Sequence, residues 1–527
     1  MNIIDKVIGY VNPNVGLRRE KARMQTQVIR EIVNTGYSEG GASTTKKSLK
    51  GFRGSSSNTI NDIDMNLDIL RQRSRNLVMT APLATSAIKT NRTNVIGSGL
   101  KLKSNIDYKT LGITKEQADE WEIKTEKEFE LWAESKWCDS LRLNNFYELQ
   151  QLALMSWLTN GDVFTVLRNL ETKHYRPYGL TIHLIEADRI STPSNNNISF
   201  NKVEGKSKKG NKIISGVEID KNGAVIAYHI CNQYPQTFNN EKREWVRVEA
   251  YGKKTGNPNV LQIMESERCE QYRGVPYLAP VIETLKQITR YTEAELTAAV
   301  ITAFFTAFIK QTNGNNEIPF SGSVPDEEQI ETDENSYELG AGTINLLGPN
   351  EDVVIADPKR PSSGFEPFVN AMSKYIGAAL EIPYDLLTKS FMKSYSASRA
   401  ALLEAWKSFR MRRSWFSNDF NQPIYVVWLS EAVARGRINA PGFFNDPAIK
   451  KAWCGAEWIG PAQGQLDPVR EVNASILRVN NGFSTREKET TELTGGNFDD
   501  NIAQIKREKE LLNQDNNQEG DNNIGQE

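Results

Sequence analysis

The side chains that could act as a catalytic nucleophile or base are few, and their surroundings argue against most enzymes. GYSEG at 36–40 has the GxSxG spacing of a hydrolase nucleophile elbow, with Ser38 as the nucleophile. That motif needs a strand before it and a helix after it, whereas here a helical REIVN precedes it and a Gly/Ser/Thr-rich coil follows. The histidines, His174, His183 and His229, lie in or near predicted strands. We expect sheet hydrogen bonds rather than base catalysis from them.

Phosphate-binding and metal-binding patterns are also missing from the sequence. Gly205-Lys206-Ser207 resembles the end of a Walker A loop, but Phe200 stands where its first glycine should be. The four cysteines are far apart and form no CxxC pair, so a reduced state without a zinc site is expected. We therefore expect no cofactor and no metal.

One stretch concentrates positive charge in a chain that is otherwise balanced. Between residues 389 and 413 seven bases stand against one acid, Glu404. Such a cluster is the best local candidate for contact with phosphate groups; the alternative is that these bases pair with acids of a neighbouring subunit. The bases are Lys389, Lys393, Arg399, Lys407, Arg410, Arg412 and Arg413.

A second stretch, 325–338, concentrates negative charge. It carries seven acids and no base, without the DxDxDG order of a calcium loop. We interpret it as a solvated acidic surface. The acids are Asp326, Glu327, Glu328, Glu331, Asp333, Glu334 and Glu338.

Length and charge limit what the chain as a whole can do. At 527 residues it exceeds the roughly 250–300 residues at which single cores stop growing, so several modules are expected. A net charge of −2 lacks the basic excess of a DNA-binding regulator. The most apolar stretch, 296–309, falls short of the ~20 residues that cross a bilayer. Residues 1–10 show no basic flank followed by a long apolar core, so we expect them not to be a signal peptide. We expect no membrane partner.

The elements that must position these residues are mixed helices and strands. Apolar spacing predicts helices over 62–92 with a break at Pro82, over 115–160 in two pieces, from Pro280 to Gln311, over 366–381, and from Ser398 with an interruption near Pro423. A period of two predicts strands at 162–170, 180–190, 216–230 and 244–250. Asn222-Gly223 predicts a type I′ hairpin. The fold class expected is α+β.

Several strings, in order, resemble the portal proteins of lambda-like phages. The first, residues 71–104, is similar to that family's Arg-rich helix, break and NVVGTGL-type turn, departing at Ala81, where the family commonly has Asn. A closing pattern of Trp458, Gly460-Pro461 and Leu466-Asp467-Pro468 fits as well. The strings between them lie at 129–139, 158–164, 185–190, 273–296, 376–388 and 395–406.

The resemblance implies a portal fold with long stem helices, an α/β wing, a small clip and a helical crown. On this map 1–60 is a flexible N-terminal arm and 513–527 a disordered tail. The regions between them are the N-terminal wing (61–277), stem helix 1 (278–311), the clip (312–364), stem helix 2 (365–383), the tunnel loop (384–397), the wing spine helix (398–436), and the C-terminal wing and crown (437–512).

The resemblance also implies the function and the partners. Portal subunits form a ring, usually a dodecamer, at one capsid vertex of the virion, assembled in the host cytoplasm with the major capsid and scaffold proteins. The ring docks the terminase large subunit and later a head-tail adaptor, and it passes double-stranded DNA without sequence specificity. A capsid-associated hydrolase or protease is the alternative.

The same map places the charged stretches. In the tunnel loop, Lys389 and Lys393 would contact phosphate transiently, and Phe391 and Tyr395 would contact DNA or pack. In a ring, the clip acids would form a collar that repels DNA, and weak or repulsive walls let DNA slide.

Overall fold

The computed structural model describes residues 13–33, 42–43, 46–49, 51–52, 56–194, 202–234, 242–304, 309–310, 346–347, 364–391, 395–463, 468–496, 498–499 and 501–510. The chain forms two compact units, Met1–Asn58 and Thr59–Glu527. The first contains α2 (Pro13–Val33), a 21-residue helix. This helix was not predicted, although the segment is rich in the strong helix formers Arg, Glu, Lys, Met and Gln. The flexible arm over 1–60 stays a prediction.

The second unit begins with helices that match the predicted ones. Pro82 separates α4 (Leu67–Thr80) from α5 (Pro82–Asn91), because proline is tolerated only in the first turn of a helix. The two predicted helices of 115–160 are α7 (Lys115–Ala133) and α8 (Phe146–Asn160), and a capping box begins each of them.

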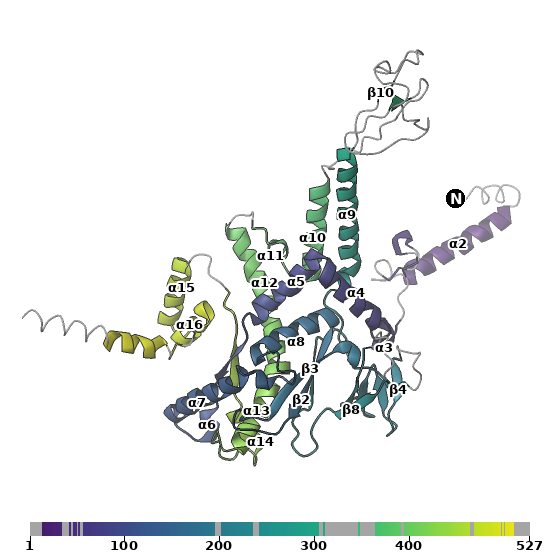
Figure 1. The fold of residues 1–527 in the computed structure, drawn as a ribbon. Coiled ribbons are helices and arrows are strands. Elements are labelled where there is room, and N and C mark those ends of the chain that lie inside the picture. The colour runs from purple at the N-terminus through teal and green to yellow at the C-terminus, as the bar shows by residue number, and fades with distance from the viewer. Residues whose placement is uncertain are drawn as a thin grey trace, which may run out of the picture. The chain divides into compact units, whose positions relative to one another are not determined.

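The described strands between residues 162 and 264 form two antiparallel sheets of this unit (Figure 1). One has the order β3-β2-β9 and packs against α8. The other has the order β4-β5-β6-β7-β8. The predicted strands are present, whereas β4, β5 and β9 were not predicted. Their bounds are β2 (Asp162–Asn169), β3 (Leu180–Glu186), β4 (Glu204–Lys206), β5 (Lys212–Ile214), β6 (Val217–Ile219), β7 (Val225–Cys231), β8 (Trp245–Glu249) and β9 (Val260–Met264).

The type I′ turn lies one hairpin earlier than predicted. Ile214 pairs with Val217, and both residues between them have positive φ, 45° at Ser215 and 88° at Gly216. In the predicted hairpin only Gly223 has positive φ, so that turn is not type I′. There the Asp220 carboxylate accepts hydrogen bonds from the Asn222 and Ala224 amides and stabilises a longer loop.

The larger hydrophobic core joins segments that are distant in sequence. Phe129 of α7 packs edge-on against Trp428 at 5.0 Å and against Phe146 of α8 at 5.6 Å. Trp428 lies on α13 (Gln422–Ala434), which follows α12 (Tyr395–Phe416) through a π-helical turn at Ser417–Asn421. The interruption predicted near Pro423 is this turn, because Pro423 occupies the start of α13.

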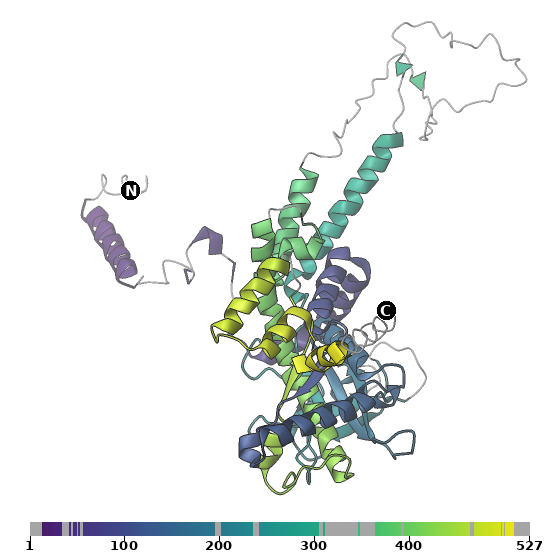
Figure 2. The same ribbon diagram turned by 90° about the vertical axis from the view of Figure 1, so that its left-hand side faces the viewer.

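Two long helices, α9 (Ile282–Phe304) and α10 (Phe365–Ala379), lie side by side (Figures 1 and 2). The Tyr291 ring lies 5.5 Å from the ring of Phe365 and 4.9 Å from that of Phe368. The prediction of one helix to Gln311 is wrong, because β10 (Ile309–Lys310) is already extended and pairs in parallel with β11 (Leu346–Leu347).

The C-terminal part returns to the body of the unit and then continues as helices. It contains α14 (Pro447–Trp453), β12 (Ala456–Ile459), α15 (Pro468–Asn480) and α16 (Arg486–Thr494). β12 pairs with β1 (Lys101–Ser104), which lies more than 350 residues earlier. Among the helices described, none has the length and apolarity that a bilayer crossing requires.

Candidate nucleic-acid-facing region

The stretch predicted as a tunnel loop, 384–397, is helical at both edges. It begins with the five-residue helix α11 (Tyr384–Thr388), and α12 begins within it at Tyr395. α11 is anchored by its buried Leu386 and Leu387. Only a short connection between the two helices is therefore available to present side chains outward.

The four residues predicted to contact DNA differ in what the structure says of them. The Lys389 Nζ donates a hydrogen bond of 2.8 Å to the Thr90 Oγ1 of α5, and partial burial lowers the pKa of this lysine. Phe391 is 52% exposed, so it is accessible to a ligand. Lys393 lies outside the described residues, and Tyr395 is described only as the first residue of α12.

The turn between α10 and α11 is tight and unusually constrained. Glu381 has φ of 53°, a left-handed conformation that non-glycine residues seldom adopt. The Ile382 amide donates to the Gly377 carbonyl at 2.9 Å, and a Cβ at Gly377 would come within 2.5 Å of the Ile382 carbonyl oxygen. The Tyr277 hydroxyl donates to the Leu380 carbonyl. Glycine at 377 is therefore required by a close backbone approach.

Arg412, predicted as a possible phosphate or inter-subunit contact, is buried within the subunit. It is 3% exposed and donates to the Glu381 carboxylate at 2.8 Å and to the Asn91 Oδ1 at 3.2 Å. Its guanidinium lies over the Tyr277 ring, 4.8 Å from the centroid. The charge stabilises the α10–α11 turn from inside the subunit.

Arg413 likewise acts within the chain. It donates to the carbonyls of Val95, Asn94 and Pro461 at 2.8 to 2.9 Å. Burial and the nearby Arg410 lower its pKa to about 10. These three bonds commit donors of Arg413 to the backbone of its own chain, and phosphate contact by this residue stays a prediction.

Three further bases of the cluster, Lys407, Arg399 and Arg410, lie on α12. Lys407 pairs with Glu404 at 2.6 Å, and both side chains are more than 70% exposed. Arg399 and Arg410 line a hollow of about 400 Å³ that also holds Glu471 and Glu492. These bases thus face acids of the same chain, and phosphate contact by them stays a prediction.

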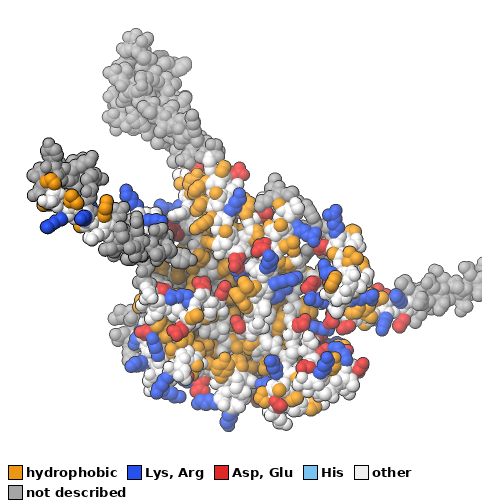
Figure 3. All heavy atoms as spheres, turned by 180° about the vertical axis from the view of Figure 1, so that it is seen from behind, with side chains coloured by type: hydrophobic (Ala, Val, Ile, Leu, Met, Phe, Trp, Pro, Cys, Tyr) orange, Lys and Arg blue, Asp and Glu red, His pale blue; other side chains and the backbone are white. Residues whose placement is uncertain are grey.

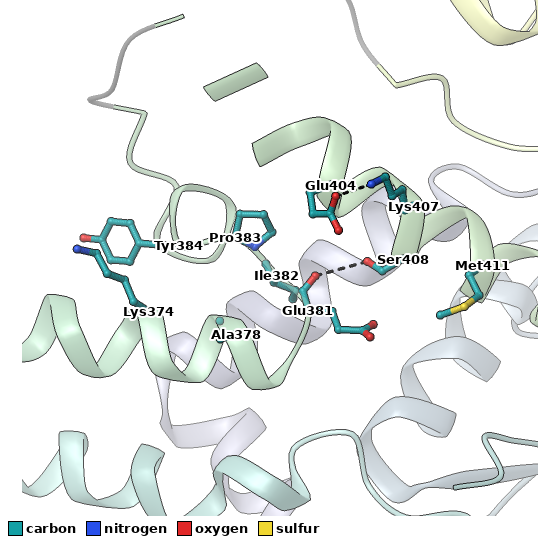
Figure 4. Close-up of a pocket in the computed structure, with 11 residues that line it drawn as sticks. Lys374, Ala378, Glu381, Ile382, Pro383, Tyr384, Glu404, Lys407, Ser408 and Met411 are labelled. Atoms are coloured by element: carbon teal, nitrogen blue, oxygen red, sulfur yellow. Dashed lines mark hydrogen bonds and ion pairs between the residues drawn. The ribbon is translucent and has the colours of Figure 1, made fainter. Parts of the chain in front are cut away.

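A hollow of about 530 Å³ opens between α10, α11 and α12 (Figure 4). Glu381 lies on one side of it, where its carbonyl accepts from Ser408 at 3.4 Å. On another side Tyr384 lies beside Lys374, with the ammonium 5.8 Å from the ring centroid. The hollow therefore borders both the constrained turn and α11.

The predicted acidic surface and the nucleophile of the alternative hydrolase function fall outside the part of the chain that the structure describes. Asp326, Glu327, Glu328, Glu331, Asp333, Glu334, Glu338 and Ser38 lie outside the described residues. His229 is engaged in the sheet, with its Nε2 3.1 Å from the Glu218 Oε2. Within the described parts of the chain, no cluster of His, Cys, Asp or Glu could hold a metal ion.

Sequence reasoning missed a buried ionic cluster centred on Asp162, where β2 begins. The Asp162 carboxylate accepts from Arg273 at 2.6 Å and from Arg71 at 3.1 Å, and all three are at most 3% exposed. Beside it, Gly161 and Gly274 touch backbone to backbone, since a Cβ at Gly274 would lie 1.9 Å from the Gly161 carbonyl oxygen.

Electrostatics keep this cluster fully charged. Burial alone raises the pKa of Asp162, but Arg273 and Arg71 outweigh burial and hold that pKa below its usual value. Burial, with the like charge of Arg273, lowers the pKa of Arg71 to about 10. Each member stands in one of the strings that carried the resemblance, 71–104, 158–164 and 273–296. The presence of these three charged residues in family-like strings was the sequence signal that could have revealed the cluster.

A family model and individual proteins that are similar in sequence are all phage portal proteins. Residues 45–413 match the family model described as phage portal protein, lambda family. Portal protein B of Escherichia phage lambda is 24% identical over 454 residues, covering 83% of this chain and 82% of its own. The portal protein of Escherichia phage N15 is 23% identical over 454 residues, covering 83% of each.

Solved structures add a remote similarity. The neck of a native gene transfer agent particle computed with C12 symmetry contains a chain with 13% identity and a TM-score of 0.38, covering 80% of this chain and 93% of that one. The neck of an empty particle computed with C6 symmetry contains one with 12% identity and a TM-score of 0.39, covering 86% and 99%.

Proposed function

Because the chain belongs to the lambda family of phage portal proteins, we propose that it is the subunit of a ring, a dodecamer, at one capsid vertex. DNA enters through this ring during packaging and leaves through it during ejection. The subunit acts as a structural conduit rather than an enzyme.

The observation that carries the proposal, beyond family membership, is the exposed apolar surface of the two long helices (Figure 3). On α9, Leu296 is 67% exposed and Val300 is 45% exposed; on α10, Phe368 and Tyr375 are 45% and 65% exposed. Large apolar patches on an isolated chain indicate a partner surface. Further copies of the same chain, arranged head to tail, would cover these faces and close into a ring.

Charge supports a conduit better than a DNA clamp. The chain carries a net charge of −2, and several bases of its basic cluster are used inside the subunit. Affinity for DNA falls with every phosphate contact that is missing, so a wall with few contacts lets the duplex slide. The DNA-facing residues we propose are Lys389, Phe391, Lys393 and Tyr395.

The regional map follows the same proposal. α9 and α10 are the stem, 312–364 is the clip that docks the terminase large subunit and then the head-tail adaptor, and α15 and α16 belong to the crown. The major capsid and scaffold proteins surround the wing. The acids between 326 and 338 form the docking surface and a collar that repels DNA.

Negative-stain microscopy of the purified full chain tests the proposal directly. We expect rings with an axial hole, and mass photometry should give a single species near twelve copies. A Leu296→Asp/Val300→Asp variant should assemble poorly, because it places charge in the proposed contact. The control Lys253→Asp, at a side chain that is 76% exposed just after β8, should assemble normally. A chain that stays monomeric at all salt and protein concentrations would contradict the proposal.

A further inference from the structure

Positive charge is concentrated in the first of the two compact units. Residues 1–58 carry ten Lys or Arg and four Asp or Glu, which gives this unit a net charge of +6. Of the chain's 64 bases and 66 acids, the second unit holds the other 54 and 62, a net charge of −8. The nearly neutral chain is therefore a basic unit joined to an acidic one, and a basic N-terminal segment is typical of a nucleic-acid contact.

The bases of this unit that the structure describes lie on its surface. Four of them fall within six residues of α2, and the side chains of all four are exposed. At a rise of about 1.5 Å per residue they span about 8 Å of the helix. Two more exposed bases lie at a short helical turn, Lys47–Leu49. These six bases are Arg18, Arg19, Lys21, Arg23, Lys46 and Lys47.

A linear polyanion matches this density of charge. Duplex DNA carries one negative charge per about 1.7 Å of its axis, so about 8 Å of duplex presents a number of phosphates similar to the number of bases on α2. Lys and Arg bind phosphate oxygens without reading the sequence. The release of counterions from the duplex then favours association.

The apolar side chains described on α2 argue against a folded protein as the ligand. A protein interface needs a compact apolar centre inside its polar rim. Leu17 and Met24 are exposed two turns apart on one side of α2, whereas exposed Val15 lies on the opposite side at 3.6 residues per turn. These three side chains therefore form no common patch.

We propose that the N-terminal unit, residues 1–58, is a DNA-binding module in which Arg18, Arg19 and Lys21 contact the phosphate backbone of duplex DNA without sequence preference. The second unit, with its net charge of −8, adds no overall attraction for the same duplex. Holding DNA and letting it slide are thus divided between the two units. The inference goes beyond the proposed function, because the module would bind DNA whether or not the chain closes into a ring.

Arg18→Gln/Arg19→Gln/Lys21→Gln on the full chain tests the module. Glutamine keeps the helix propensity of these positions and removes their charge. Fluorescence anisotropy with a random-sequence duplex at low salt should show affinity lowered about tenfold or more, because three phosphate contacts are lost. The slope of log affinity against log salt concentration should become shallower by about three.

A matched control removes the same charge from the second unit. Lys109→Gln/Lys124→Gln/Lys127→Gln changes three exposed side chains of α6 (Tyr108–Leu111) and α7. This variant should bind the duplex like the wild type. Equal affinities of the wild type and the α2 variant would overturn the module. Equal losses in the two variants would overturn it as well, because the effect would then come from total charge.

Two competitors decide the class of ligand. Vesicles that contain phosphatidylserine, and polyglutamate, should each fail to displace the duplex from the wild type at matched charge. Displacement by the vesicles would overturn the DNA assignment in favour of a lipid surface, and displacement by polyglutamate would overturn it in favour of an acidic protein.

Negative-stain images separate the module from the proposed function. The α2 variant should form the same particles as the wild type, and loss of rings in this variant alone would overturn the module, because its bases would then serve assembly. Absence of rings in the wild type would contradict the proposed function, whereas the difference in duplex affinity between the two variants would still test the module.

Discussion

The Asp162 cluster and the contacts around α11 are built from the same kinds of charged and polar side chain, but they differ in how deeply those side chains are buried. Around Asp162 every charge is buried and faces an opposite charge, and two glycines press the backbones together. Around α11 the charges are less evenly enclosed: Arg412 is buried, but its partner Glu381 is 55% exposed, and Lys389 donates to the Thr90 hydroxyl. Removing one partner of a buried ion pair lowers the free energy of unfolding strongly. Water can replace a partner in a half-exposed contact, so the loss there is small. The polar contacts of the first region are therefore harder to break than those of the second.

The largest effect should come from Asp162→Asn. It removes the carboxylate that Arg273 and Arg71 bind directly and leaves Arg71 with the more distant Asp188 at 3.8 Å, so the free energy of unfolding in urea should fall by about 3–5 kcal/mol. The matched control is Asp119→Asn, which removes an exposed pair with Lys115 and should cost about 0.5 kcal/mol or less. Equal losses in the two variants would remove the contrast between buried and exposed charge.

A smaller, pH-dependent effect should come from Glu218 in the five-stranded sheet. Burial raises its pKa, but hydrogen bonds from Arg247, Asn211 and His229 outweigh burial and lower the pKa to about 2 from an ordinary 4.5. A lowered pKa gives stability that is present above pH ~4.5 and is lost as the pH falls towards 2. Glu218→Gln should flatten the fall of the unfolding midpoint in that window. If the variant's unfolding midpoint fell with pH as the wild type's does, Glu218 would not contribute to the acid sensitivity of stability.

The smallest global effect and the most local one should come from Arg412→Met. Methionine fills the buried space, and Glu381 can remain hydrated, so the loss of charged hydrogen bonds should cost about 1.5–3 kcal/mol. Hydrogen exchange should rise at 380–391 but not along α13. If hydrogen exchange rose equally at 380–391 and along α13, the α10–α11 turn would unfold together with the core. The proposed difference between this turn and the Asp162 cluster would then be wrong.

Local chemistry made much of the fold predictable. Pro82 had to begin a helix, and the capping residues Thr114 and Asn145 begin α7 and α8 where apolar spacing placed them. The type I′ turn was misplaced because Asn-Gly is only a local preference, and the strand pairing selected Ser215-Gly216 instead. The helix over 13–33 was missed because its polar composition was taken for a flexible arm.

The candidate site was less predictable, because a basic residue looks the same in sequence whether it is buried or exposed. Arg410 and Arg412 are two positions apart on one helix, yet Arg410 is exposed and Arg412 is buried against Glu381, Asn91 and Tyr277. The separation of these contacts in sequence, 321 residues for Asn91, lies beyond any local pattern.

The sequence by itself determined the family and most of the helices and strands, because motif order, proline positions and apolar periodicity are properties of neighbouring residues. Only the tertiary structure decided which charges are fixed and which are free. That outcome depends on what the fold brings beside each group, as with Asp162 between two arginines and Lys389 against a threonine of α5.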